Sequence, residues 1–163
     1  MALNLSDELR SFFDGQQGRR VVIVGIGSPI RHDDAVGLKI IELLDGRLPS
    51  NVLLLQTETV PESYTGAIRD FHPTHVLLLD AANFNGVPGE GRIIPSKMIA
   101  NVSVSTHSLP LNIFIDYIRK SICENVTLLG IQGLEIGFGE GITPRVLEGA
   151  AVITNLLIDM LGE

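Results

Sequence analysis

Short apolar runs alternate along this chain with segments in which apolar residues recur at helical spacing. The runs at residues 20–25 and 75–80 are apolar on both faces, and similar runs occur at residues 52–56 and 126–131. Strands that are apolar on both faces are typical of a sheet covered by helices on both sides. The alternation therefore predicts an α/β fold built on a layered sheet.

The expected helices lie between these runs, and residues at several of their boundaries are typical helix signals. Ser6 is the expected N-cap of an opening helix. Thr143 is the expected cap of the last helix, which begins at Pro144 and ends at Gly162. Further helices are expected at residues 34–44 and 64–71 and after Pro110, and a short edge strand at residues 92–94. No internal repeat or linker interrupts the pattern, so we expect one domain over residues 1–163.

The net charge of the chain limits the kinds of molecule that it can bind. The 163 residues include 12 lysines and arginines and 19 aspartates and glutamates, which gives a formal net charge of −7. Nucleic-acid binding depends on the neutralisation of phosphates by clustered basic residues, and the sequence has no such cluster. We therefore expect no nucleic-acid partner.

Cysteine usage and hydropathy indicate the compartment. The single cysteine, Cys123, excludes an internal disulfide and fits a reducing cytoplasm. No apolar run approaches the ~18 residues needed to span a bilayer, and residues 1–8 lack the basic and apolar regions of a secretory signal. We expect a cytoplasmic protein without membrane insertion.

Two carboxylates and a histidine follow the expected strands at the sheet edge where open α/β folds bind ligands. Asp34 lies near the start of one helix, Asp80 ends the third strand, and His107 precedes another helix. A helix N-terminus disfavours imidazolium, so His107 is expected to be neutral and able to bind a metal ion. Three such ligands leave coordination positions open for a substrate or water, and the pattern indicates a divalent-metal site.

Each of these residues also has a structural interpretation. Asp33 and Asp34 can complement the dipole of the following helix. Asp80 can form a turn after its strand, and His107 can hydrogen-bond to a backbone carbonyl. His32 fits both a residue that assists the site and a residue of a solvated turn. Separations of 46 residues between the two acids and 27 between Asp80 and His107 mean that only the fold can bring the three together.

The loop after the first strand also fits a dinucleotide site in part. Gly25 and Gly27 have the spacing of a pyrophosphate-binding turn, but the third glycine of that fingerprint is replaced by Ile30. Two adjacent carboxylates near the helix start repel phosphate. Nucleotide binding is therefore the weaker alternative.

Two further reactive side chains are interpreted as structural. His75 lies at the opposite end of its strand from the candidate site. Cys123 lies late in an expected helix, and no base is near it in the sequence, so a packed thiol is favoured over a nucleophile.

In combination these segments resemble the [NiFe]-hydrogenase maturation endopeptidases, from about Arg20 to near the C-terminus. The family likeness rests on residues 25–28, 33–37, 79–81 and 105–111, and a closer likeness to the hydrogenase 3 type rests on residues 71–75, 88–90, 106–112 and 129–132. Ser28 replaces an asparagine usual in the family, and Gly133 replaces a proline frequent in that type. Residues 1–18 extend beyond the likeness as an N-terminal helical extension.

The resemblance implies a three-layer α/β/α sandwich around a twisted, mostly parallel sheet of about five strands. It also implies an endopeptidase, grouped with the aspartic type, that removes the C-terminal extension of a [NiFe]-hydrogenase large-subunit precursor after nickel insertion. Asp34, Asp80 and His107 match the catalytic and nickel-recognising positions of the family. The nickel is carried by the precursor, and other divalent metals can occupy the same ligands.

On this hypothesis the enzyme docks the nickel-loaded precursor and cleaves it only when the metal is present. The alternative is a non-catalytic nickel-binding maturation chaperone, which uses the same ligands but breaks no peptide bond. In either case we expect a monomer whose partner is the large-subunit precursor.

Overall fold

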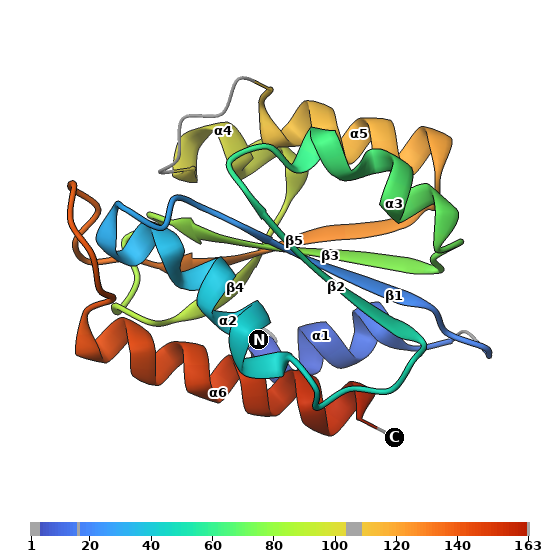
Figure 1. The fold of residues 1–163 in the computed structure, drawn as a ribbon, viewed down its shortest axis with the longest axis horizontal. Helices are drawn as coiled ribbons and strands as arrows, with labels where there is room; N and C mark the ends of the chain where they lie inside the picture. Colours follow the sequence, from blue (N-terminus) through green and yellow to red (C-terminus); the bar gives the residue numbers. More distant parts are fainter. Residues whose placement is uncertain (1–3, 16, 104–108, 163) are drawn as a thin grey trace.

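A computed structural model describes residues 4–162 except residue 16 and residues 104–108. Its centre is a five-stranded sheet in the order β2-β1-β3-β5-β4 (Figure 1). The first four strands in this order run parallel, and β4 pairs antiparallel with β5 at one edge. The strands are β1 (Val21–Ile26), β2 (Val52–Glu58), β3 (His75–Ala82), β4 (Gly91–Ile94) and β5 (Asn125–Gln132). The predicted α/β class, with a mostly parallel sheet, is confirmed.

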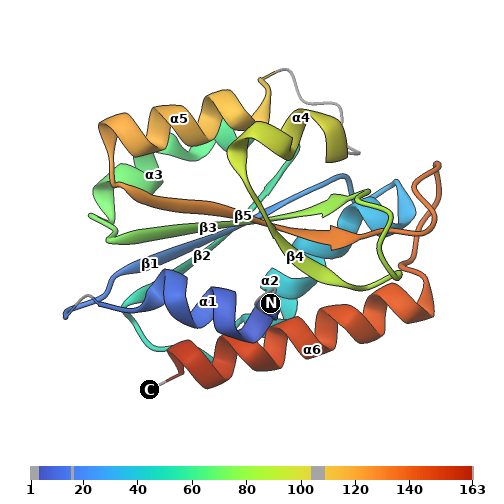
Figure 2. The ribbon, with the colours of Figure 1, turned by 180° about the vertical axis from the view of Figure 1, so that it is seen from behind.

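Helices cover both faces of the sheet, as Figures 1 and 2 show. One face carries α1 (Leu5–Phe13), α2 (Val36–Leu44) and α6 (Pro144–Leu161), and the other carries α3 (Thr65–Asp70), α4 (Ile99–Val102) and α5 (Leu111–Ser121). Short 3-10 helices, η1 (His32–Ala35), η2 (Pro61–Tyr64) and η3 (Ser96–Met98), precede α2, α3 and α4. The three layers agree with the expected sandwich. Within the part of the chain that the structure describes, no helix is long and apolar enough to cross a bilayer.

The strand composition explains this layering. Along β1, Val21 and Ile23 pack into the core under α1, α2 and α6, whereas Val22 and Val24 pack into the core under α3, α4 and α5. Every residue of β1 and of β3 is buried. Strands that are apolar on both sides must be covered on both sides, because each exposed apolar face would lose the free energy of burial.

Capping differs from the sequence-based expectation at two helices, although α6 begins at Pro144 as expected. The first helix begins at Leu5, and its N-cap is Asn4, whose side chain accepts a hydrogen bond of 2.8 Å from the amide of Asp7. The predicted Ser6 cap is therefore wrong. Thr143 occupies the N-cap position of α6, but its side chain makes no capping bond, because its hydroxyl donates to a buried carboxylate in another segment.

Helix α2 approaches the sheet closely at Gly37. A Cβ atom at this position would lie 2.5 Å from the carbonyl oxygen of Leu79 and 2.7 Å from that of Ile26. Both obstacles are backbone atoms of central strands, so neither can move aside cheaply. The absence of a side chain at Gly37 therefore sets the distance between α2 and the ends of β1 and β3.

We expect Gly37→Ala to lower the free energy of unfolding by about 2 kcal/mol or more, because α2 must move away from the sheet. Urea unfolding followed by circular dichroism measures the change. Gly66→Ala is the matched control: Gly66 also lies in a helix, α3, and nothing lies within 4 Å of its added Cβ. Its stability should be unchanged or slightly raised. Equal stability of the two variants would contradict the close-packing role of Gly37.

His75 lies at the amino end of β3, away from the candidate site, and is only 1% exposed. Its ring contacts the rings of Phe12 and Phe13 from α1. Burial, with the nearby positive charge of Arg19 as the smaller cause, holds the pKa of His75 below its usual 6.5. The neutral ring thus packs as part of the core, as expected for a residue with a structural role.

This lowered pKa predicts a loss of stability on acidification. The unfolded chain takes up a proton at His75 as the pH falls through about 6.5, whereas the folded chain does so only at lower pH. The free energy of unfolding should therefore fall below pH 6.5 until the folded-state pKa is passed. Urea unfolding at a series of pH values measures it, with His75→Gln for comparison. An identical pH dependence in the two proteins would refute the prediction.

Candidate active site

The fold brings Asp34 and Asp80 to the same edge of the sheet. Asp34 lies in η1, directly after β1, and η1 contacts β3, the strand that contains Asp80. Gly37, one turn after Asp34, packs against the carbonyl oxygen of Leu79, the residue before Asp80. The two acids, 46 residues apart in the sequence, are thus placed together at the carboxyl edge, as the open-sheet rule predicts.

Both carboxylates are buried and oriented by backbone amides. Asp34 is 1% exposed, and its Oδ2 accepts a hydrogen bond of 3.0 Å from the amide of Ser28. Asp80 is also 1% exposed, and its Oδ1 accepts a hydrogen bond of 2.9 Å from the amide of Ala81. Acids fixed in this way are suited to bind a cation or to accept a proton, because their oxygens need no reorganisation.

Asp80 does not end its strand, contrary to the expectation. β3 continues to Ala82, which pairs with Gln132 of β5. A turn-forming role for Asp80 is thereby excluded, because the residue lies within a paired strand opposite Gly130.

The third expected residue, His107, lies outside the described residues. Among the residues that the structure does describe, no group of three His, Cys, Asp or Glu side chains is placed to hold a metal ion. The described part of the candidate site is therefore the pair of acids.

Asp33 has a role that the sequence did not indicate. It is fully buried, and its carboxylate accepts bonds from the amides of Leu134 and Glu135, at 2.9 and 2.8 Å. It also accepts bonds from the amide and the hydroxyl of Thr143, at 2.8 and 3.1 Å. The carboxylate therefore fastens the segment before α6 to the segment that carries Asp34. Asp33 does not simply complement the helix dipole, since all four of these donors lie in another part of the chain.

His32 also joins the segment that carries Asp34 to the segment before α6. It is half-buried with a left-handed backbone, φ 43°, and its Nδ1 lies 3.0 Å from the carbonyl oxygen of Gly141. Its amide donates to the carbonyl of Gly139 at 2.9 Å. The ring therefore packs against the second segment and does not lie in a solvated turn.

Gln132 is a second organising residue that the sequence did not single out as such. It is 6% exposed, and both the oxygen and the nitrogen of its side-chain amide form hydrogen bonds. Its Oε1 accepts from the amides of Phe84 and Gly86, at 2.9 and 3.0 Å. Its Nε2 donates to Asn83 Oδ1 at 3.2 Å and to the carbonyl of Gly133 at 2.9 Å. Gln132 thus fixes the loop that leaves the strand of Asp80.

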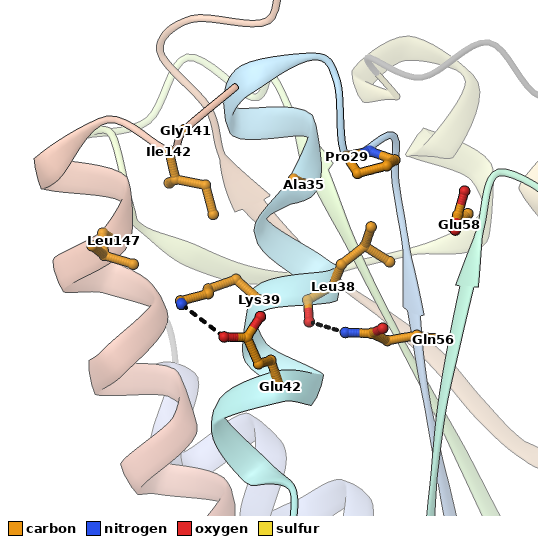
Figure 3. A pocket seen from close by; sticks show the side chains of 10 residues that line it. All are labelled: Pro29, Ala35, Leu38, Lys39, Glu42, Gln56, Glu58, Gly141, Ile142 and Leu147. Carbon is orange, nitrogen blue, oxygen red and sulfur yellow. Dashed lines mark hydrogen bonds and ion pairs between the residues drawn. The ribbon is translucent and has the colours of Figure 1, made fainter. Parts of the chain in front are cut away.

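A shallow groove of about 420 Å³ lies beside these residues, over the outer side of α2 (Figure 3). Pro29 and Ala35 line its upper part, next in sequence to Ser28 and Asp34. Lys39 and Glu42, one turn apart on α2, form an ion pair of 3.1 Å in its lining. Asp34 and Asp80 do not line the groove, so it adjoins the acids without containing them.

Cys123 follows α5 and does not lie late in a helix as expected, but it fits the interpretation as a packed thiol. It is a free, partly buried thiol, and burial raises its pKa. A raised pKa keeps the thiol protonated at neutral pH, which makes it a poor nucleophile.

An open α/β sheet with paired buried acids at its carboxyl edge has the form of an enzyme site, and comparisons with known proteins identify the class. The family model of hydrogenase maturation proteases matches residues 38–159. The hydrogenase 3 maturation protease of Escherichia coli K12 is 32% identical over 137 residues, which are 83% of this chain and 87% of the relative. The chain belongs to the hydrogenase maturation protease family.

Two further comparisons agree with this assignment. A Methanocaldococcus jannaschii protein, provisionally assigned as a hydrogenase maturation protease, is 34% identical over 153 residues, or 89% of this chain and 90% of the relative. The crystal structure of a [NiFe] hydrogenase maturation protease from Thermococcus kodakarensis KOD1 superposes with a TM-score of 0.85 at 35% identity, covering 96% of this chain and 99% of that one. The resemblance to this family, including the hydrogenase 3 type, is confirmed, and the chain is a hydrogenase maturation endopeptidase.

Proposed function

We propose that this endopeptidase removes the C-terminal extension of a [NiFe]-hydrogenase large-subunit precursor after nickel has been inserted. The observation that supports the proposal most directly is the placement of Asp34 and Asp80, both buried, at one sheet edge. Two buried carboxylates that come from distant parts of the sequence and lie at the ligand-binding edge of an α/β sheet are placed to act on one substrate. Membership of the protease family favours peptide cleavage over nucleotide binding and over a non-catalytic nickel chaperone.

In this proposal Asp34, Asp80 and His107 recognise the nickel that the precursor carries. Two carboxylates and an imidazole form an O,O,N ligand set that suits nickel and leaves positions for ligands of the precursor. The metal positions the scissile bond and polarises its carbonyl or activates the attacking water. A carboxylate that does not contact the metal accepts the proton of that water. Cleavage then depends on prior metal insertion and acts as a proofreading step.

The nickel dependence is tested with one precursor preparation divided into nickel-loaded and nickel-free portions. After incubation with this protein, mass spectrometry of the intact precursor should show loss of the C-terminal peptide from the loaded portion only. Rapid cleavage of the nickel-free portion would overturn nickel recognition. Release of nickel without any cleavage would instead favour the chaperone alternative.

A further inference from the structure

Two loops beside the candidate site form one rigid unit, which we call the paired loops: residues 28–35 and 133–143. Arg31 and Gly139 form a parallel β-bridge. The amide of Gly139 donates to the carbonyl of Ile30, at 2.9 Å, and the buried Asp33 carboxylate adds four further bonds between the loops. This bonding fixes the backbone of a surface segment that would otherwise be a long glycine-rich loop.

The paired loops present large apolar side chains to solvent. Phe138 is 84% exposed, Leu134 is 62% exposed and Ile30 is 54% exposed. Phe138 and Leu134 have the highest exposures among the large apolar residues that the structure describes. Phe138 directly precedes Gly139, whose amide bonds to the carbonyl of Ile30. The backbone next to Phe138 therefore lies beside the loop of residues 28–35. Several exposed large apolar side chains on two bonded segments favour a protein-binding role for this surface.

The rigidity of this surface favours binding. Aromatic side chains at the centre of an interface often provide much of its affinity. A loop that becomes ordered only on binding loses conformational entropy, and this loss weakens the affinity. The bond from the Leu134 amide to Asp33 holds the backbone of Leu134. The bonds of Gly139 to Ile30 and His32 hold the backbone next to Phe138, so little order has to be gained on binding.

The charge of the paired loops identifies the chemistry of the partner. Of their four carboxylates, those of Glu135 and Glu140 are exposed, whereas those of Asp33 and Asp34 are buried. The one guanidinium, that of Arg31, is part-buried and donates to the carbonyl of Ile136. The whole chain has a net charge of −7. A second copy of this acidic chain would be repelled here, whereas a surface with lysines or arginines around an apolar centre would be attracted.

We propose that the paired loops dock the substrate protein itself, through an apolar surface of the precursor that basic residues surround. This inference rests on the proposed function, because it takes the precursor as the partner. Asp33 and Asp34 are adjacent in sequence and belong to the same unit, so a protein held by the paired loops lies directly beside the proposed nickel-recognising acid. Affinity from this surface is separate from metal recognition and also acts on the nickel-free precursor.

The test is a steady-state comparison with the full-length protein and the nickel-loaded precursor. The double variant Leu134→Ser, Phe138→Ser should raise KM by about tenfold or more and leave kcat within about twofold, because it removes docking but not chemistry. Val152→Ser is the matched control: Val152 is 60% exposed but lies on α6, outside the paired loops, and its variant should keep both constants. Glu140→Gln should raise KM more at low salt than at high salt.

Binding of nickel-free precursor, measured by calorimetry, separates this inference from the proposed function. Weaker binding of the double variant, with unchanged binding of Val152→Ser, supports docking even if cleavage proves independent of nickel. An unchanged KM and unchanged binding in a folded double variant would overturn the inference, whether or not nickel dependence holds. So would a wild-type dimer that the double variant converts to a monomer without a change in KM, because the surface would then join two copies of this chain.

Discussion

Asp34→Asn should reduce cleavage of the nickel-loaded precursor by at least about a hundredfold while the protein stays folded. The substitution removes the negative charge that the proposed nickel recognition requires. It keeps the shape of the side chain, and an amide oxygen can still accept the 3.0 Å hydrogen bond from the amide of Ser28. The rate is measured as the appearance of mature large subunit by intact-mass spectrometry, with thermal unfolding as the check on the fold.

Asp116→Asn is the matched control for this prediction. Asp116 is an exposed carboxylate of α5 that forms an ion pair of 3.9 Å with Arg119. Its variant should cleave at the wild-type rate. His107→Ala should lose activity as Asp34→Asn does, since the imidazole is the nitrogen ligand of the proposed set. Full activity of a folded Asp34→Asn protein would refute the assignment of Asp34.

Asp33→Ala should have the largest effect on stability, with the free energy of unfolding falling by about 3–5 kcal/mol. The substitution removes a buried carboxylate that accepts four hydrogen bonds, and it leaves the amides of Leu134, Glu135 and Thr143 without this acceptor. Bonds to a charged acceptor contribute about 1.5–3 kcal/mol each, but their loss is not additive. Urea unfolding followed by circular dichroism gives the value.

Thr143→Val is the graded comparison for Asp33. It removes only the hydroxyl bond of 3.1 Å and keeps the bond from the amide of residue 143. The expected decrease is about 1 kcal/mol. A free energy of unfolding of Asp33→Ala equal to or above that of Thr143→Val would contradict this prediction. The carboxylate would then not be the main connection between the paired loops.

Local sequence pattern was sufficient for the five strands and for five of the six α-helices that the structure describes, but α4 was not predicted. Apolar strands such as β1 and β3 can be recognised because burial on both faces requires a continuous apolar run. Boundaries were less accurate, because they depend on individual hydrogen bonds. The choice of Asn4 over Ser6 as a cap is decided by one bond of 2.8 Å, and β3 extends past Asp80 because β5 continues to pair with it.

For the candidate site, too, the sequence predicted one part and the structure was needed for the other. The placement of Asp34 and Asp80 could be predicted from the sequence, since a carboxylate near the carboxyl end of a buried strand lies at the ligand-binding edge of an α/β sheet. Their burial and the contact between η1 and β3 required the structure. The catalytic and nickel-recognising roles of Asp34, Asp80 and His107 stay predictions.

The sequence by itself determined the class of fold and the family, and it singled out candidate side chains for the chemistry, because periodicity and residue type act over a few neighbouring positions. Only the tertiary structure decided what Asp33, His32 and Gln132 do. The partners of Asp33 lie 101 to 110 residues away, and no local pattern specifies which distant amides a buried carboxylate will meet. The exposure of Phe138 on rigid loops has the same origin, since chain segments that are far apart in sequence hold it there.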